Sequence, residues 1–256
     1  MNDMNQHPTA LDRWRGLFPT PKPVLAMLHL GGDGPAEKVA RARAEASILA
    51  DGGVDAVIVE NYFGDSDDVR RALEAVCADA PTTVIGLNVL RDHELAFALA
   101  EEFPVGFVQL DSVAGHLEPA DDDEYAARLA ERRSSSRALV LGGVRFKYQP
   151  VRSGRTEAED LALGAQRSDA IVVTGDGTGM ETAVSKIERF RAALPSGFPL
   201  VVGAGVTDAN AAEQLRSADG AIVGSFLKDT YRDTGVVDAA HVARLMDAVA
   251  AVRSAR

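Results

Sequence analysis

Short apolar runs rich in valine and isoleucine alternate along the chain with longer stretches whose apolar residues recur at helical spacing. Runs that are apolar throughout predict strands buried on both faces, which is typical of a parallel sheet covered by helices. The stretches between them, such as residues 39–50 and 242–249, predict amphipathic helices. The expected strands begin near Val24, Asp55, Thr83, Val105, Ala138, Asp169, Pro199 and Gly220.

Eight strand–helix units of about 30 residues each fill the chain, and no linker or low-complexity tract divides them. This alternation predicts an α/β protein with a parallel eight-stranded (β/α)8 TIM barrel. An open doubly wound sheet is the alternative, but its glycine-rich turn would follow the first strand, whereas the glycine-rich turns here come late. We expect a single domain over residues 1–256, with an N-terminal extension at 1–21 and the barrel at 22–253.

A short motif recurs at the start of three expected strands, where an aspartate closes the loop from the preceding helix. We interpret Asp55, Asp169 and Asp219 as residues that tie these loops at the N-terminal face, which contributes stability to a barrel rather than chemistry. Two helix starts are also expected. One lies near Glu181, and the other is the acidic segment 121–124, interpreted as a solvated N-terminal cap.

Composition and charge narrow the class of protein. Of 256 residues, 46% are hydrophobic and 25% charged, which is ordinary for a folded chain. The net charge of −11 opposes binding to nucleic acid and to anionic lipid, so neither is an expected partner. No apolar run approaches the roughly 18 residues of a membrane span, and the first residues lack the apolar segment of a secretory signal, so we expect a cytoplasmic protein. The single cysteine, Cys77, is interpreted as a small core residue.

Polar residues close the apolar runs at the strand ends that carry the chemistry of a barrel. Burying a carboxylate, amide or ammonium group is costly unless the group is paired, so a ring of them needs mutual hydrogen bonds or a ligand. Singly, each is equally consistent with a satisfied structural residue. We predict catalytic roles for His29, Glu60, Asp111 and Lys147, and substrate binding by Asn61, Asn88, Gln109, Thr174 and Gly175.

Two glycine turns follow the seventh and eighth expected strands, where barrels often bind phosphate. Glycines let backbone N–H groups approach an anion, and helix N-termini add partial positive charge. We therefore predict phosphate binding by Gly203, Gly205, Gly224 and Ser225. A purely steric need for glycine is the alternative.

Two features leave alternatives open. Residues 174–179, TGDGTG, would form a second ligand cradle, a lid hinged on glycines or merely a flexible loop. No nucleophile elbow, HExxH, Walker A or cysteine cluster is present, so we predict no metal and no other cofactor. Glu60, Asp111 and His29 nevertheless are residue types that could bind a divalent cation.

At these strand ends the sequence resembles the BtpA/SgcQ family of barrels. The motifs that carry the resemblance are PVLAMLHL (23–30), GVDAVIVEN (53–61), GLNVLRD (86–92), TG (174–175), GAGVT (203–207) with Asn210, and ADGAIVGS (218–225) with LK (227–228). The resemblance covers residues 22–250 and implies a barrel with a phosphate-like site at the two glycine turns. Family members are associated with photosystem I biogenesis in cyanobacteria and with sugar-uptake operons elsewhere.

The sequence departs from the family pattern at two strand ends. It has QLDS (109–112) where the family has an Asn-rich segment, and GVRFKY (143–148) where the family has Asp-x-x-x-Lys-His. Only Lys147 of the second motif aligns. A different reaction or substrate within a retained phosphate site is therefore expected.

The leading functional hypothesis is an enzyme acting on a phosphorylated small molecule, either a sugar phosphate or a ribosyl phosphate. Two carboxylates, Glu60 and Asp111, favour glycosyl cleavage or transfer. Lys147 would instead allow Schiff-base chemistry of the aldolase or isomerase type. A non-catalytic assembly factor is the other class, and it would need an exposed apolar patch rather than buried polar strand ends. Homo-oligomerisation is left open.

Overall fold

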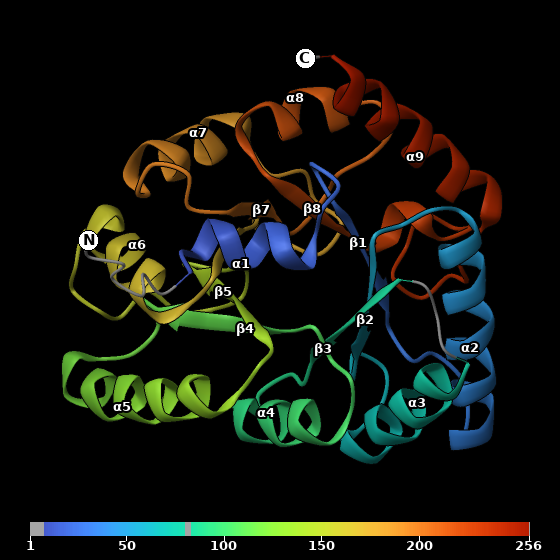
Figure 1. Cartoon of the computed structure of the whole chain (residues 1–256), viewed down its shortest axis with the longest axis horizontal. Coiled ribbons are helices and arrows are strands. Elements are labelled where there is room, and N and C mark those ends of the chain that lie inside the picture. Colours follow the sequence, from blue (N-terminus) through green and yellow to red (C-terminus); the bar gives the residue numbers. More distant parts are fainter. Residues whose placement is uncertain (1–7, 80–82, 256) are drawn as a thin grey trace, which may run out of the picture.

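The computed structural model describes residues 8–79 and 83–255. Within these residues, eight parallel strands close into a barrel in which β8 pairs with β1 (Figure 1). Each strand begins no more than two residues from its expected start, so the predicted TIM barrel is confirmed. The strands are β1 (Val24–Leu28), β2 (Ala56–Glu60), β3 (Val84–Asn88), β4 (Phe107–Ala114), β5 (Leu139–Val144), β6 (Ala170–Val173), β7 (Leu200–Val202) and β8 (Gly220–Val223).

Helices follow the strands and form a ring around the barrel (Figure 1). None in the described part of the chain is both long and apolar enough to cross a membrane. The helices are α1 (Ala10–Leu17), α2 (Pro35–Asp51), α3 (Ser66–Ala78), α4 (His93–Glu102), α5 (Pro119–Ser135), α6 (Glu157–Arg167), α7 (Val184–Ala193), α8 (Ala211–Ser217), the short 3-10 helix η1 (Ser225–Leu227) and α9 (Ala239–Ser254).

Two sequence expectations about the helices need adjustment. Helix α7 begins at Val184 rather than near Glu181. The acidic start of α5 is not simply solvated, because Asp122 is buried and forms ion pairs with Arg155 and Arg167. Cys77 is half-buried and packs against the core, as expected.

Side chains alternate along each strand between the interior of the barrel and the layer beneath the helices. In β1, Leu25 and Met27 belong to the interior cluster, while Val24, Ala26 and Leu28 belong to the outer cluster. Both faces of the strand are therefore buried in apolar surroundings. This explains why the strand segments are apolar throughout rather than alternating with polar residues.

Phe107 of β4 occupies the interior of the barrel. A Cβ at Gly86 of β3 would lie only 2.1 Å from the ring, so glycine is the residue that fits beside it. On the N-terminal side, Phe18 packs on Phe107 with ring centroids 5.9 Å apart, and Trp14 packs on Phe18 at 4.6 Å. Figure 1 shows α1 lying across this end. The expected N-terminal extension thus contains a helix that covers one end of the barrel.

The three loop-tying aspartates act as expected from the sequence. Each carboxylate accepts a hydrogen bond of 2.8–2.9 Å from the backbone N–H near the start of the preceding strand. Each also pairs with arginine side chains from neighbouring elements: Asp55 with Arg253, Asp169 with Arg13 and Arg133, and Asp219 with Arg191.

The more deeply one of these aspartates is buried, the more it should contribute to the free energy of unfolding. The Asp169 side chain is 4% exposed and that of Asp219 is 36% exposed. Breaking a buried ion pair costs about 3–5 kcal/mol and breaking an exposed one about 1 kcal/mol or less. We expect Asp169→Ala to lower the free energy of unfolding clearly more than Asp219→Ala, measured by urea denaturation. Equal losses would contradict this explanation.

Candidate active site

The inward positions at the carboxyl ends of the strands carry polar side chains. His29 lies two residues after the inward-facing Met27, and Glu60 lies two residues after Ile58. Because inward positions in a strand are two residues apart, these polar side chains continue the inner face of the barrel. The alternation that builds the apolar interior therefore also aims the polar residues at the barrel axis.

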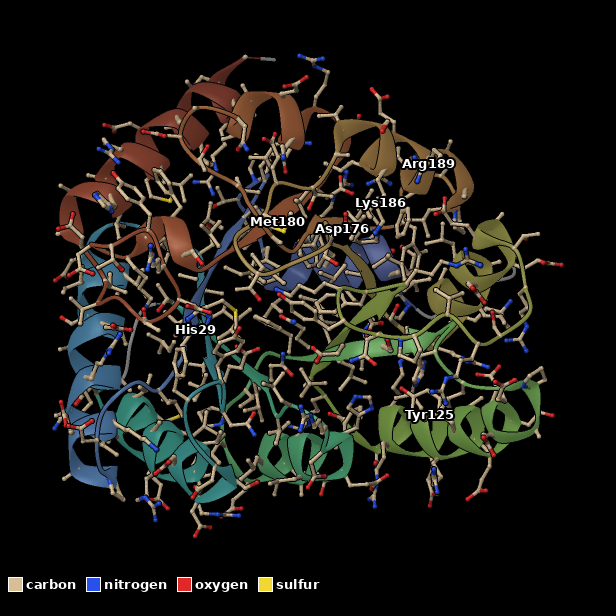
Figure 2. All side chains as sticks on the ribbon, turned by 180° about the vertical axis from the view of Figure 1, so that it is seen from behind. His29, Tyr125, Asp176, Met180, Lys186 and Arg189 are labelled. Atoms are coloured by element: carbon tan, nitrogen blue, oxygen red, sulfur yellow. The ribbon has the colours of Figure 1, made fainter. Side chains whose placement is uncertain are left out.

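These side chains border a cavity of about 470 Å³ at the C-terminal end of the barrel. Figure 2, seen from the side opposite to α1, places His29 within the ring of helices. All four predicted catalytic residues and all four predicted phosphate-binding residues line the cavity. The predicted residues found there are His29, Glu60, Gln109, Asp111, Lys147, Gly203, Gly205, Gly224 and Ser225.

Glu60 and Asp111 form a carboxylate pair held by one amide. Asn88 Nδ2 donates to Glu60 Oε1 at 2.8 Å and to Asp111 Oδ1 at 3.3 Å. Burial, reinforced by the charge of Asp111, raises the pKa of Glu60 to about 8. Burial also raises the pKa of Asp111, while Asn88 and the cationic Lys147 act in the opposite direction. One proton is therefore retained by this pair near neutral pH.

His29 lies beside the carboxylate pair. Its Nε2 is 3.8 Å from Glu60 Oε2, and its Nδ1 is 3.3 Å from the carbonyl oxygen of Asp233. Burial, together with the charge of Lys228, lowers the pKa of His29 to about 4. His29 is therefore neutral at physiological pH and can exchange a proton with a ligand without first losing a charge.

Lys147 is carried by a tight turn after β5. The backbone N–H of Gln149 donates to the carbonyl of Phe146, and the backbone N–H of Lys147 donates to Thr174 Oγ1 at 2.9 Å. The ammonium group lies 5.7 Å from the centroid of the Phe146 ring. It makes no ion pair within 4 Å among the described residues. The ammonium group of Lys147 can therefore bind a ligand in the cavity.

Residues of the loops after β7 and β8 line the cavity. The N–H groups of Gly205, Gly224 and Ser225 make no hydrogen bond with other residues that the structure describes. At Gly205, where φ is 72°, a Cβ would also lie 2.3 Å from the backbone of Met180 and Glu181. The alternative of a purely steric need for glycine thus applies to Gly205, because only a residue without a Cβ leaves space for the loop between β6 and α7.

The segment 174–179 forms part of the cavity wall. Tyr148 Oη accepts a hydrogen bond from the Thr178 N–H at 2.9 Å, and Thr178 Oγ1 lies 3.4 Å from Tyr62 Oη. A Cβ at Gly179 would lie 3.1 Å from Ser225 Oγ. These contacts draw the segment toward the loops after β2, β5 and β8. In Figure 2, Asp176 and Met180 of this loop lie over the interior of the ring.

Four of the predicted substrate-binding residues do not line the cavity but support it. Besides Asn88, Asn61 Oδ1 accepts the N–H of Leu90 at 2.7 Å, and Thr174 Oγ1 accepts the N–H of Lys147. At Gly175, a Cβ would lie 2.7 Å from the carbonyl oxygen of Glu181. Their hydrogen bonds and close approaches position the loops, so the structure supports a positioning role for them.

Comparison with known proteins agrees with this architecture. A family model described as the BtpA family matches residues 20–251. The chain belongs to the BtpA family. It is 27% identical over 260 residues to Photosystem I biogenesis protein BtpA from Synechocystis, covering 91% of this chain and 90% of that protein. It is 30% identical over 224 residues to an uncharacterized protein from Archaeoglobus fulgidus, covering 80% and 86%.

Solved structures similar to this BtpA-family chain include phosphoribosyl anthranilate isomerase from Thermus thermophilus. Its TM-score is 0.59 at 17% identity, covering 90% of this chain and 99% of that one. Another is (S)-3-O-geranylgeranylglyceryl phosphate synthase from Thermoplasma acidophilum in complex with substrate sn-glycerol-1-phosphate. Its TM-score is 0.61 at 15% identity, with coverages of 94% and 98%. At such identities the likeness shows the fold alone.

Sequence reasoning missed several residues of this BtpA-family cavity. Tyr62 and Tyr148 directly follow the predicted site residues Asn61 and Lys147, so extending each strand end by one residue would have found them. Arg91 lies within the motif of residues 86–92 but was assigned no role there, whereas Tyr231 lies on a loop without a motif and is found only in the structure. The additional polar or aromatic lining residues are Tyr62, Arg91, Phe146, Tyr148, Gln149, Thr178, Thr207, Phe226 and Tyr231.

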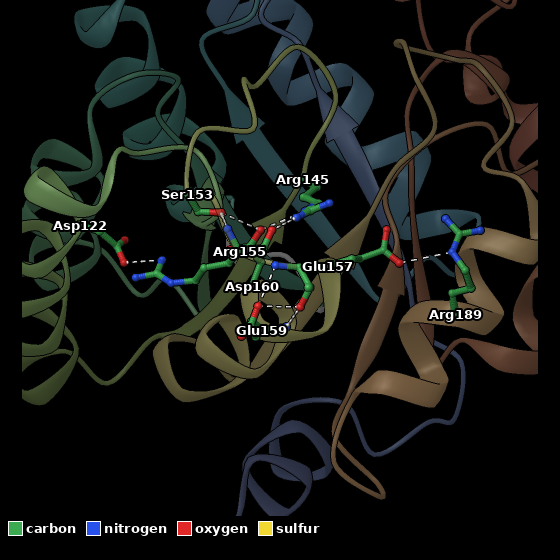
Figure 3. A network of polar contacts seen from close by, with 9 residues as sticks. Asp122, Arg145, Ser153, Arg155, Glu157, Glu159, Asp160 and Arg189 are labelled. Carbon is green, nitrogen blue, oxygen red and sulfur yellow. Dashed lines mark hydrogen bonds and ion pairs between the residues drawn. The ribbon is translucent and has the colours of Figure 1, made fainter.

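An ion-pair network anchors the loop that carries Lys147 and Tyr148 (Figure 3). The fully buried Asp160 accepts hydrogen bonds from Arg145 Nε at 2.9 Å and from Ser153 Oγ at 3.1 Å. Arg145 also donates to the carbonyl of Arg155 at 2.7 Å, closing the loop onto itself. The start of the loop is thereby tied to α6.

The raised pKa of Glu60 predicts a pH-dependent cost to the stability of this BtpA-family protein. Between its unfolded value, about 4.5, and its folded value, about 8, the folded state retains a proton that the unfolded state loses. Stability of the wild type should therefore fall across this range relative to Glu60→Gln, which cannot ionise, by a few kcal/mol, since one pKa unit corresponds to about 1.4 kcal/mol. Urea unfolding at pH 4, 6 and 9 measures the difference. A gap that does not change with pH would refute the assignment.

Proposed function

We propose that this BtpA-family chain is an enzyme that cleaves or transfers the glycosyl group of a phosphorylated sugar or ribosyl phosphate. The observation that carries the proposal is the carboxylate pair of Glu60 and Asp111, held by Asn88 at the carboxyl ends of β2, β3 and β4. Two carboxyl groups beside one bond are the usual apparatus of glycosidic cleavage. The cavity that they border has room for a ligand of this class.

In the proposed reaction Glu60 is the general acid, because its raised pKa keeps it protonated near neutral pH. As the bond between C1 of the sugar and the leaving atom breaks, that atom takes the bonding electrons and the proton of Glu60. Asp111, as carboxylate, stabilises the positive charge that develops on the sugar. Water or another acceptor then bonds to C1 and gives its proton to Asp111.

The phosphate of the substrate would bind at the loops after β7 and β8. Gly205, Gly224 and Ser225 line the same cavity as the carboxylates, their N–H groups make no hydrogen bond among the described residues, and hydrogen bonds from backbone N–H groups suit a phosphate. The names of proteins with a similar fold support a phosphorylated ligand, since one structure holds sn-glycerol-1-phosphate and another is a phosphoribosyl anthranilate isomerase. This site would set the distance between the phosphate and the scissile bond.

Two other functions have an observation in their favour. Lys147 lines the cavity and forms no ion pair within residues 8–79 and 83–255, which favours a Schiff-base aldolase or isomerase acting on a sugar phosphate. The Synechocystis relative is named a photosystem I biogenesis protein, which favours an assembly factor. The carboxylate pair has no role in an assembly factor, so glycosyl chemistry remains the proposal.

The catalytic roles predict that each carboxylate is needed for turnover. Glu60→Gln and Asp111→Asn preserve the side-chain shapes, and each should lower kcat at least ~100-fold because general acid–base groups contribute at least this much. The assay measures release of free sugar phosphate from a panel of phosphorylated glycosides. Lys147→Met serves as the comparison. A borohydride-trapped adduct lost in Lys147→Met would replace glycosyl cleavage with the Schiff-base route, and full activity of both carboxylate variants would exclude this active site.

The phosphate site predicts a charge effect at Ser225, which lies at the cavity and is half-buried. Ser225→Asp places a negative charge beside the backbone donors and should abolish the rise in melting temperature caused by ribose 5-phosphate. Ser225→Ala leaves the N–H groups intact and should retain most of that rise. Thermal-shift titration measures both. If wild type shows no rise with ribose 5-phosphate or inorganic phosphate, the phosphate site is wrong.

A further inference from the structure

Tyrosines are concentrated at one place in this chain. Only 5% of the residues are phenylalanine, tryptophan or tyrosine, and four are tyrosines. Three of those four, Tyr62, Tyr148 and Tyr231, line the cavity. They come from the loops after β2, β5 and β8, which meet only at the open end of the barrel.

Tyr148 is held in a backbone conformation that its side chain does not favour. It occupies the third position of the turn from Phe146 to Gln149 with φ of 62°, where glycine or asparagine is usual. Bulky residues rarely adopt this region, and such strain persists chiefly at functional sites. The residue is 72% exposed, yet its hydroxyl is fixed by the N–H of Thr178. An oriented ring with open faces is a surface for stacking.

Tyr231 has a similarly strained backbone on the loop after β8. Its φ is 55°, and its ring stacks on His241 with centroids 4.3 Å apart and an interplanar angle of 18°. Arg244 donates to its hydroxyl at 2.8 Å, which fixes the ring further. Two tyrosines at the cavity are thus both strained in their backbone and fixed by hydrogen bonds.

The end of the barrel that holds the cavity also carries the exposed apolar side chains. The large exposed apolar side chains among the described residues all lie on loops at this end of the barrel, and we call them the apolar rim. The rim consists of Phe63, Tyr148, Val151, Met180, Tyr231 and Val236. The polar groups lie deeper, at the strand ends. The cavity therefore offers a polar floor for a sugar phosphate and an aromatic entrance, which two residues of the rim, Tyr148 and Tyr231, line.

We infer that the entrance binds a planar aromatic ring, and that the substrate is a phosphorylated glycoside whose leaving group is such a ring, as in a nucleoside 5′-monophosphate. The inference rests on the proposed function for the phosphate and the carboxylates. Tyr148 stacks on the ring, while the phosphate occupies the loops after β7 and β8. The bond between C1 and the ring breaks, and the proton of Glu60 goes to the ring atom that leaves.

Binding measurements on Tyr148 variants test this inference. Isothermal titration calorimetry compares ribose 5-phosphate with AMP, GMP, CMP and UMP. Wild type should bind at least one nucleotide about tenfold more tightly than ribose 5-phosphate, the size expected from one stacking contact. Tyr148→Gly should lose that advantage and keep its affinity for ribose 5-phosphate. Tyr148→Phe keeps the ring and should keep the advantage.

The melting temperature and a control variant in the same loop show whether Tyr148 binds the ligand or has only a structural role. Glycine suits a φ of 62°, so Tyr148→Gly should melt no lower than wild type, whereas a structural tyrosine would lower the melting temperature. Val151→Ser removes an exposed apolar side chain of the same loop outside the cavity and should change no affinity.

Three outcomes would overturn the inference. If ribose 5-phosphate binds but no nucleotide binds more tightly, the ring site is wrong and the phosphate site stands. If Tyr148→Gly weakens ribose 5-phosphate as much as the nucleotide, Tyr148 does not recognise the ring. If neither ribose 5-phosphate nor a nucleotide binds, the proposed function fails as well. Contact with a protein partner is then the remaining role for the apolar rim.

Discussion

The interior of the barrel receives side chains from all eight strands, and the space on its axis is limited. Phe107 occupies that space in the lower part of the barrel and leaves room only for glycine at position 86. One step higher, the inward positions hold charged and amide groups instead of apolar ones. These groups are crowded by the same geometry, and Asn88 donates hydrogen bonds to both carboxylates.

Crowding and burial also set the chemistry of the site. Removing Glu60 from water, next to Asp111, raises its pKa, while removing His29 from water lowers its pKa. Both shifts favour the neutral form of the side chain. They also reverse the ordinary order of the two pKa values, so that the pKa of Glu60 lies above that of His29. The site thereby holds a carboxylic acid and a neutral imidazole near pH 7. Burying these two groups lowers the stability of the folded protein, which fully solvated side chains would not do.

The loops around the cavity depend on support from outside it. Asp160 and Arg145 tie the start of the loop that carries Lys147 and Tyr148 to α6. Similarly, the buried Lys228 donates to Glu45 of α2 at 2.7 Å and secures the loop that follows η1. Left-handed backbone at Tyr148 and Tyr231 persists beside such anchors. Strain at the cavity is thus offset by ion pairs that are buried away from it.

The sequence alone determined the barrel, its strand starts and most of the residues on its polar inner face. These follow from local properties, because strand alternation and apolar content can be read within a few residues. Only the tertiary structure decided that Asn88 bridges the carboxylates, that α1 covers the opposite end and that Tyr148 and Tyr231 frame one cavity. Those relations join segments far apart in the chain, and closure of the barrel brings them together.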